Sequence, residues 1–119
     1  MKSKCVIIAG EFSADVLGVE IMSAINNIEW YGIGGPLMDA KKLNKFYEWD
    51  KISAFGLSDV IFSLPRLYYY ASKIADKIIK INPKIIVTVD TKGFNFYLIK
   101  LIRHKLKTKN NMPKFIHIV

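Results

Sequence analysis

Several features that narrow the class of a protein are scarce in this sequence. It contains one cysteine, Cys5, so no disulfide can form within the chain, and the apolar residues around it indicate a buried thiol in a reducing compartment. No uncharged apolar stretch approaches the roughly 18 residues that a membrane-spanning helix needs. The apolar segment at the start is too short for a signal peptide. We therefore expect a cytoplasmic protein that is soluble or peripheral on a membrane.

Acidic residues and arginine are also scarce. The sequence has ten Asp and Glu residues and 18 Lys and Arg residues, which gives a net charge of +8, and only two of the basic residues are arginine. Positive potential favours anionic partners such as nucleic acid, phospholipid surfaces or phosphorylated substrates. Lysine, isoleucine and asparagine are abundant together, however, so the base composition of a genome explains the charge equally well. The charge by itself identifies no partner.

What is present is an alternation of strand and helix patterns. The 119 residues, 51% of them hydrophobic, suffice for one compact domain with a core. Apolar, β-branched runs predict strands over residues 4–9, 29–33, 46–49, 84–89 and 114–119. Apolar residues spaced three and four apart predict helices over 16–28, 36–43, 56–81 and 94–106, with Pro65 dividing the third into a short and a longer helix. This order predicts an α/β fold with a doubly wound, Rossmann-like, mostly parallel sheet covered on both faces.

The segment after the first strand is a candidate site, because ligands of doubly wound folds bind at the carboxyl ends of strands. Gly10 permits a tight turn, and the start of the following helix offers N–H donors to an anion. Glu11 would repel an anion and suits a hydroxyl group or the role of a base. Ser13 or Asp15 is placed to cap the helix, which explains Asp15 adequately.

Two further candidates follow the second and fourth strands. Gly34 and Gly35 lie in a glycine-rich turn, which either lets a ligand approach the backbone closely or serves only to turn the chain. Asp90 comes directly after the β-branched run of residues 85–89, where the crevice of the sheet would open. Partial burial there would raise its pKa toward that of a general base, although a turn or helix-cap aspartate fits the same pattern.

The aromatic run that includes Tyr68 and Tyr69 is unusual. Consecutive tyrosines cannot all face a core, so we expect exposed aromatic surface here, which suits a membrane interface, acyl chains or a protein partner. The two histidines, His104 and His117, are too far apart in the sequence to form a recognisable metal site. No metal is expected.

Four motifs resemble those of the lipid-A-disaccharide synthases, in the same order. Residues 8–18, Ile-Ala-Gly-Glu-Phe-Ser-Ala-Asp-Val-Leu-Gly, resemble the opening Ala-Gly-Glu-x-Ser-Gly-Asp-x-x-Gly of that family. Residues 32–38 are similar to its Gly-x-x-Gly-Pro-x-Met, 55–60 to its Met-Gly-x-x-Glu-Val, and 89–95 to its Ile-Asp-x-Pro-Asp-Phe-Asn. Residues 115–119 are similar to the strand that precedes a Ser-Pro-Ser-Val-Trp-Ala-Trp segment. The sequence departs from the family at Ala14, a usual glycine, and at residues 92–93, a usual Pro-Asp.

The resemblance implies an inverting glycosyltransferase of the two-domain GT-B type. Such enzymes transfer 2,3-diacylglucosamine from its UDP derivative to 2,3-diacylglucosamine 1-phosphate and release UDP, at the cytoplasmic face of the inner membrane. Residues 1–119 would form a truncated, acceptor-side N-terminal domain, with the UDP-sugar-binding domain absent. No cofactor and no nucleic acid would be involved.

The resemblance also assigns roles to residues. Asp90 would be the catalytic base, with Glu11 as polar support or as the alternative base. The remaining assignments are substrate binding by Gly10, Ser13, Asp15, Gly34, Gly35 and Asn95, and membrane or acyl contact by Leu67, Tyr68 and Tyr69.

Three hypotheses follow for the chain as a whole. It is one part of an enzyme that works with a separately encoded C-terminal half, a non-catalytic remnant, or a free-standing α/β module that binds a lipid or nucleotide. Under the first two, the chain is inactive in isolation. A reading frame that begins downstream near Ser-Pro-Ser-Val-Trp would favour the first.

Overall fold

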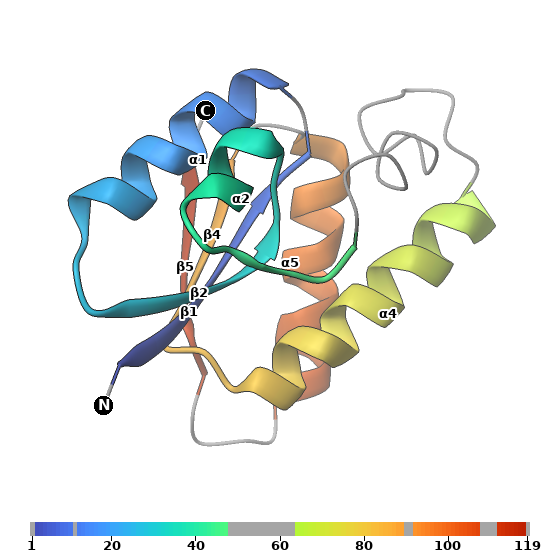
Figure 1. Cartoon of the computed structure of the whole chain (residues 1–119). Coiled ribbons are helices and arrows are strands. Elements are labelled where there is room, and N and C mark those ends of the chain that lie inside the picture. Colours follow the sequence, from blue (N-terminus) through green and yellow to red (C-terminus); the bar gives the residue numbers. More distant parts are fainter. Residues whose placement is uncertain (1, 11, 48–63, 90–91, 108–111, 119) are drawn as a thin grey trace.

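The computed structural model describes residues 2–10, 12–47, 64–89, 92–107 and 112–118. These residues form an α/β fold, as the sequence predicts (Figure 1). The strands are β1 (Ser3–Ala9), β2 (Ile28–Ile33), β3 (Asn44–Lys45), β4 (Ile85–Val89) and β5 (Lys114–Ile118). The helices are α1 (Phe12–Ala24), α2 (Pro36–Ala40), α4 (Leu64–Ile81) and α5 (Lys92–Leu106).

The five strands form one parallel sheet in the order β3-β2-β1-β4-β5. The chain winds outward from β1 to β3 and then returns, so that β4 pairs with the other edge of β1. Figure 1 shows α1 and α2 on one side of the sheet and α4 and α5 on the other. The winding therefore reverses between β1 and β4, and the crevice at the carboxyl ends of these two strands is where a doubly wound fold binds its ligands.

Strand β1 is central and is buried on both faces. Val6 and Ile8 pack in the core that contains residues of α4 and α5, whereas Cys5 and Ile7 pack in the core that contains residues of α1 and α2. Burial on both faces explains why this strand is a continuous apolar run without alternation. Cys5 is buried as predicted, and desolvation by burial raises the pKa of its thiol.

Helix α1 is shorter than its apolar pattern predicts. It ends at Ala24, and Ile28 already begins β2, so the prediction of a helix to residue 28 is wrong. Asn27, with a φ of 62°, lies between the two elements in the left-handed region that asparagine tolerates. Ile28 nevertheless packs against the core on the α1 side, which is why it continues the helical spacing.

Strand β3 lies earlier than predicted. It pairs Asn44 and Lys45 with β2, whereas the sequence pattern placed it at residues 46–49, of which 48 and 49 lie outside the described residues. The Asn44 side chain donates a hydrogen bond to the Trp30 carbonyl at 3.0 Å. A side-chain hydrogen bond from Asn44 therefore helps to hold β3 against β2, although residues 44–45 lack the apolar pattern from which strands were predicted. Helix α2 likewise stops at Ala40 rather than residue 43.

Helix α4 confirms the longer of the two helices predicted around Pro65. Since α4 begins at Leu64, Pro65 lies in its first turn, where the missing N–H costs no helical hydrogen bond. The shorter helix predicted before it lies outside the described residues. Asn82 ends α4 with a φ of 57°, and its N–H bonds to the carbonyls of Ile78 and Ile79.

Candidate active site

The carboxyl ends of β1 and β4 adjoin each other. Ala9, the last residue of β1, is the register partner of Val89, the last residue of β4. The two predicted carboxylates, Glu11 and Asp90, lie outside the described residues, so their roles stay predictions. Their places in the sequence, two residues after Ala9 and one after Val89, agree with a shared crevice at the switch point.

Asp15 caps a helix other than its own. It lies inside α1, 1% exposed, and its carboxylate accepts hydrogen bonds from the backbone N–H groups of Gly35 at 2.9 Å and Met38 at 3.1 Å through Oδ1. Oδ2 accepts a third, from Leu37 at 3.0 Å. The prediction that Asp15 caps α1 is therefore wrong. The carboxylate satisfies N–H donors at the start of α2 and fixes that helix against α1.

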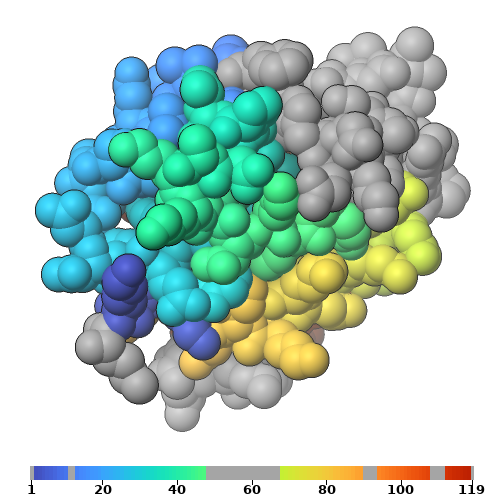
Figure 2. Space-filling view, in the orientation of Figure 1, coloured from blue at the N-terminus to red at the C-terminus, as the bar shows by residue number. Residues whose placement is uncertain are grey.

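Gly34 and Gly35 are packed tightly against this cap. A Cβ atom at Gly35 would lie 2.5 Å from Asp15 Oδ2, and one at Gly34 would lie 2.5 Å from the Met38 sulfur. Both glycines are buried. The absence of a side chain at these glycines lets Asp15 and Met38 pack closely against them. The N–H groups of Gly35, Leu37 and Met38 already donate hydrogen bonds to Asp15. Figure 2 shows α1 and α2 side by side on the surface of the molecule.

The other substrate-binding residues predicted around the crevice are placed differently. Asn95, in α5, is fully buried, and its side-chain nitrogen lies 3.5 Å from the carbonyl of Val89, at the end of β4. Gly10 follows β1 directly and is partly buried, whereas Ser13 is exposed on the first turn of α1. Asn95 and Gly10 thus lie at the ends of the two strands that form the crevice, and substrate binding by all three stays a prediction.

The exposed aromatic surface is confirmed. Tyr68 is 54% exposed and Tyr69 is 52% exposed on α4, while the side chain of Leu67 lies outside the described part of the structure. The ammonium group of Lys73 lies 4.9 Å from the centre of the Tyr69 ring, and a hydrogen bond from this lysine to Tyr69 raises the pKa of Lys73. The surface therefore combines aromatic rings with a firmly protonated amine.

A buried polar pair near the crevice was missed by sequence reasoning. Thr88 is fully buried and its hydroxyl lies 2.7 Å from Nδ1 of His117, its register partner on β5. The ring of Phe96 covers His117 with the ring centres 4.7 Å apart. The available signal was a polar residue near the end of each of the two strand patterns, Thr88 in residues 84–89 and His117 in residues 114–119.

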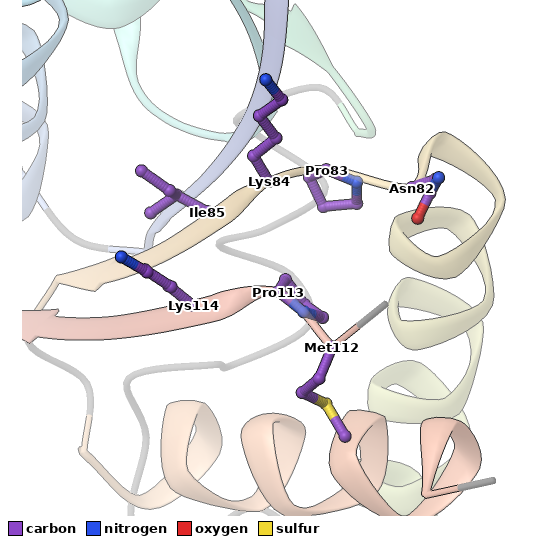
Figure 3. Close-up of a pocket in the computed structure, with 7 residues that line it drawn as sticks. All are labelled: Asn82, Pro83, Lys84, Ile85, Met112, Pro113 and Lys114. Carbon is purple, nitrogen blue, oxygen red and sulfur yellow. The ribbon is translucent and has the colours of Figure 1, made fainter. Parts of the chain in front are cut away.

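A cavity of about 600 Å³ lies at the amino ends of β4 and β5, at the end of these strands opposite Ala9 and Val89 (Figure 3). It is lined by the residues that lead into β4 and β5, among them Asn82, Lys84, Met112 and Lys114. Because catalytic groups of α/β folds gather at the carboxyl ends of strands, we do not assign the active site to this cavity.

Among the described residues no group of three or more His, Cys, Asp or Glu side chains could hold a metal ion. No helix in the same residues is long and apolar enough to cross a bilayer.

Comparison with known proteins identifies the family. Residues 5–119 match the family model for lipid-A-disaccharide synthetase, which covers both strands of the crevice and the capped loop. The chain belongs to this family. The match confirms the family resemblance and extends it from the separate motifs to nearly the whole sequence.

Relatives with this activity in their names match the chain at about 30% identity. The lipid-A-disaccharide synthase of Chlamydia trachomatis serovar D is 31% identical over 121 residues, which cover 98% of this chain and 19% of the relative. That of Wigglesworthia glossinidia brevipalpis is 31% identical over 118 residues, 95% of this chain and 29% of the relative. A probable mitochondrial lipid-A-disaccharide synthase of Arabidopsis thaliana is 35% identical over 109 residues, which cover 85% of this chain and 23% of the relative. The chain thus spans less than a third of the length of these family members.

Proposed function

We propose that this chain forms the acceptor-side domain of a lipid-A-disaccharide synthase. The whole enzyme would transfer 2,3-diacylglucosamine from its UDP derivative to 2,3-diacylglucosamine 1-phosphate, with inversion at the anomeric carbon. The observation that carries the proposal is the family match over residues 5–119. It is supported by the reversal of winding between β1 and β4, because doubly wound folds bind their ligands at such a switch point.

Asp90 is the proposed catalytic base. A carboxylate at the end of β4 would accept the proton of the acceptor 6-hydroxyl as its oxygen attacks the anomeric carbon and the bond to UDP breaks. Glu11, after β1, would hold the acceptor or act as the base in place of Asp90. Gly10, Ser13 and Asn95 lie near these strand ends and would contact the acceptor. Asp15 fixes the loop that carries Gly34 and Gly35 and would thereby act on the site indirectly, and substrate binding by these three residues stays a prediction.

The donor site would lie on the part of such an enzyme that is outside the segment matched by residues 5–119. More than two thirds of each of the three relatives lies outside the matched segment, and the resemblance places UDP binding in a second domain. A separately encoded C-terminal half would supply it. We therefore expect the isolated chain to be inactive.

Contact with the inner membrane is proposed for the surface of α4. Tyr68 and Tyr69 are exposed, Leu67 precedes them, and Lys73 lies over the ring of Tyr69. Aromatic rings settle at the level of lipid headgroups, and a lysine beside them would pair with phosphate. Such a surface would hold the domain at the cytoplasmic face, where both diacylated substrates are embedded.

The proposal is tested in a chimera in which this chain replaces the matched 118 residues of the Wigglesworthia synthase. We expect the chimera to form disaccharide from both substrates, the isolated chain to form none, and Asp90→Asn to lower kcat of the chimera at least 100-fold, as expected for loss of a general base. Asp39→Asn, at an exposed acid outside the crevice, is the control. Full turnover by the Asp90→Asn chimera would contradict the assignment of the base, and robust product from the isolated chain would contradict the missing donor site.

A further inference from the structure

A histidine near the carboxyl end of β5 uses one of its two ring nitrogens and leaves the other without a partner. Nδ1 of His117 lies 2.7 Å from the hydroxyl of Thr88, its fully buried register partner on β4. Nε2 is buried as well, and it has no hydrogen-bond partner among the residues that the structure describes. Buried polar atoms are almost always hydrogen-bonded, so this nitrogen needs a partner from outside the described residues.

The contact with Thr88 determines what Nε2 has to offer. A buried hydroxyl needs an acceptor for its hydrogen, and Nδ1 of His117 is an acceptor at the right distance. A neutral imidazole that accepts at Nδ1 carries its proton on Nε2. The ring of Phe96 lies over the imidazole, with the ring centres 4.7 Å apart, and limits its rotation. Nε2 is then a fixed donor, suited to a carboxylate oxygen.

Among the acids of the chain, Asp90 has the place in the sequence that suits this donor. The acids outside the described residues are Glu11, Glu48, Asp50, Asp59 and Asp90. Of these, only Asp90 directly follows a strand that pairs with β5. Side chains two places apart on an extended strand share a face and are separated by about 6.6 Å, which is the spacing from Thr88 to Asp90 along such a strand. An imidazole that bonds at both nitrogens joins groups that are about 7 Å apart.

We propose that His117 is a positioning residue for the catalytic base, in which Thr88 donates to Nδ1 and Nε2–H donates to the carboxylate of Asp90. The inference rests on the proposed function, since it adds a residue that acts through the base of the same reaction. The imidazole holds one carboxylate oxygen, which leaves the other oxygen to accept the proton of the acceptor hydroxyl.

Asn95 supports the same arrangement from α5. Its side-chain nitrogen lies 3.5 Å from the carbonyl of Val89, which belongs to the peptide that joins Val89 to Asp90. The end of β4 is thus approached by side chains from β5 and from α5. Holding a base in one orientation raises the rate because the reacting atoms need no further ordering in the transition state.

Two amide substitutions separate the two nitrogens of the ring. In His117→Asn the shorter amide lies near the position of Nδ1 and still bonds to Thr88, but nothing replaces Nε2. In His117→Gln the longer amide reaches the position of Nε2 and donates to Asp90. We expect His117→Asn to lower kcat of the chimera with the Wigglesworthia synthase by about 10- to 100-fold without a change in KM, and His117→Gln to restore most of it. His104→Asn, at an exposed histidine of α5, is the control and should leave kcat unchanged.

Parent-like kcat of the His117→Asn chimera would overturn the proposal. Equal losses in the two variants would overturn it too, because they would assign the effect to packing or to the contact with Thr88. Loss in His117→Gln alone has the same consequence.

Nitrogen-15 NMR of the isolated chain tests the contact with the native His117, so it does not depend on the folding of the His117 variants. We expect Asp90→Asn to shift the Nε2 resonance of His117 and to speed the exchange of its proton with water. The resonances of the exposed His104 should stay unchanged and serve as the reference. An Nε2 resonance of His117 that does not respond to Asp90→Asn would overturn the proposal.

Disaccharide formation by the chimera with the native His117 separates this proposal from the proposed function. If no product forms, the proposed function is refuted, whereas the NMR result still shows whether His117 bonds to Asp90. Product formation with parent-like kcat in the His117→Asn chimera would uphold the proposed function and refute the positioning role.

Discussion

Replacing Asp15 by alanine should be among the most damaging single changes to the stability of this domain. The carboxylate accepts three backbone hydrogen bonds at the start of α2, and two of the three donors, Gly35 and Met38, are buried. A buried donor without an acceptor costs about 1–3 kcal/mol, and loss of a helix cap costs about 0.5–2 kcal/mol. These values overlap, so we expect Asp15→Ala to lower the free energy of unfolding by about 3 kcal/mol.

Two companion variants make the prediction specific. Asp15→Asn keeps one oxygen as an acceptor but turns an amide donor toward the N–H of Leu37 or Gly35, so it should cost about half as much as alanine. Asp39→Ala is the control, because Asp39 lies in the same short helix, its side chain is 49% exposed and it forms a surface ion pair with Lys45 at 3.1 Å. Its loss should cost less than about 1 kcal/mol.

Urea denaturation followed by circular dichroism measures all three variants. The free energy of unfolding of each comes from linear extrapolation, with the slope checked against the parent chain. A domain of this size has a total stability of about 5–15 kcal/mol, so a loss of 3 kcal/mol displaces the midpoint clearly. If Asp15→Ala costs no more than Asp39→Ala, the cap does not stabilise the fold and the account of the loop is wrong.

Three further predictions concern packing, membrane contact and pH. Gly35→Ala places a methyl group 2.5 Å from the capping carboxylate and should cost about 1–3 kcal/mol in the same urea assay; a change below 0.5 kcal/mol would show that the carboxylate moves freely. The double variant Tyr68→Ser and Tyr69→Ser should float with liposomes of anionic phospholipid several-fold less than the parent chain. The control Phe96→Ser, at a side chain that is 52% exposed on α5, should float as the parent does. If the parent itself does not float, membrane contact is refuted. Because burial raises the pKa of Cys5, its contribution to stability should be complete below the thiol pKa of the unfolded chain and be lost as pH rises through the higher folded value, and Cys5→Ala should remove that part of the pH dependence of unfolding.

The sequence sufficed to predict elements whose stability comes from local apolar patterns. Strands β1 and β4 were predicted almost to the residue, because β-branched runs bounded by glycine or proline permit few alternatives. The longer helix of the segment that Pro65 was expected to divide followed from the helical spacing of its apolar residues. Parallel pairing and layer order followed from the alternation of strands and helices.

The features that the sequence could not reveal depend on contacts between distant residues. Asp15 was assigned to its own helix because nothing in the local pattern points to donors 20 residues away. Strand β3 was misplaced because Asn44 holds it through a side-chain hydrogen bond to β2. For the candidate site, the sequence identified the strand ends at Ala9 and Val89, whose pairing supports a shared crevice, whereas the catalytic assignment rests on family resemblance.

The single carboxylate that joins α1 to α2 makes the formation of α2 depend on α1. A helix of five residues has too few internal hydrogen bonds to persist in water without tertiary contacts, so α2 should form only once Asp15 is in position. The two β-α units would then acquire their structure in a fixed sequence, first β1 with α1 and afterwards the Gly34–Gly35 loop. Hydrogen exchange should accordingly find the amides of Gly35, Leu37 and Met38 opening together, whenever the early half of α1 unravels.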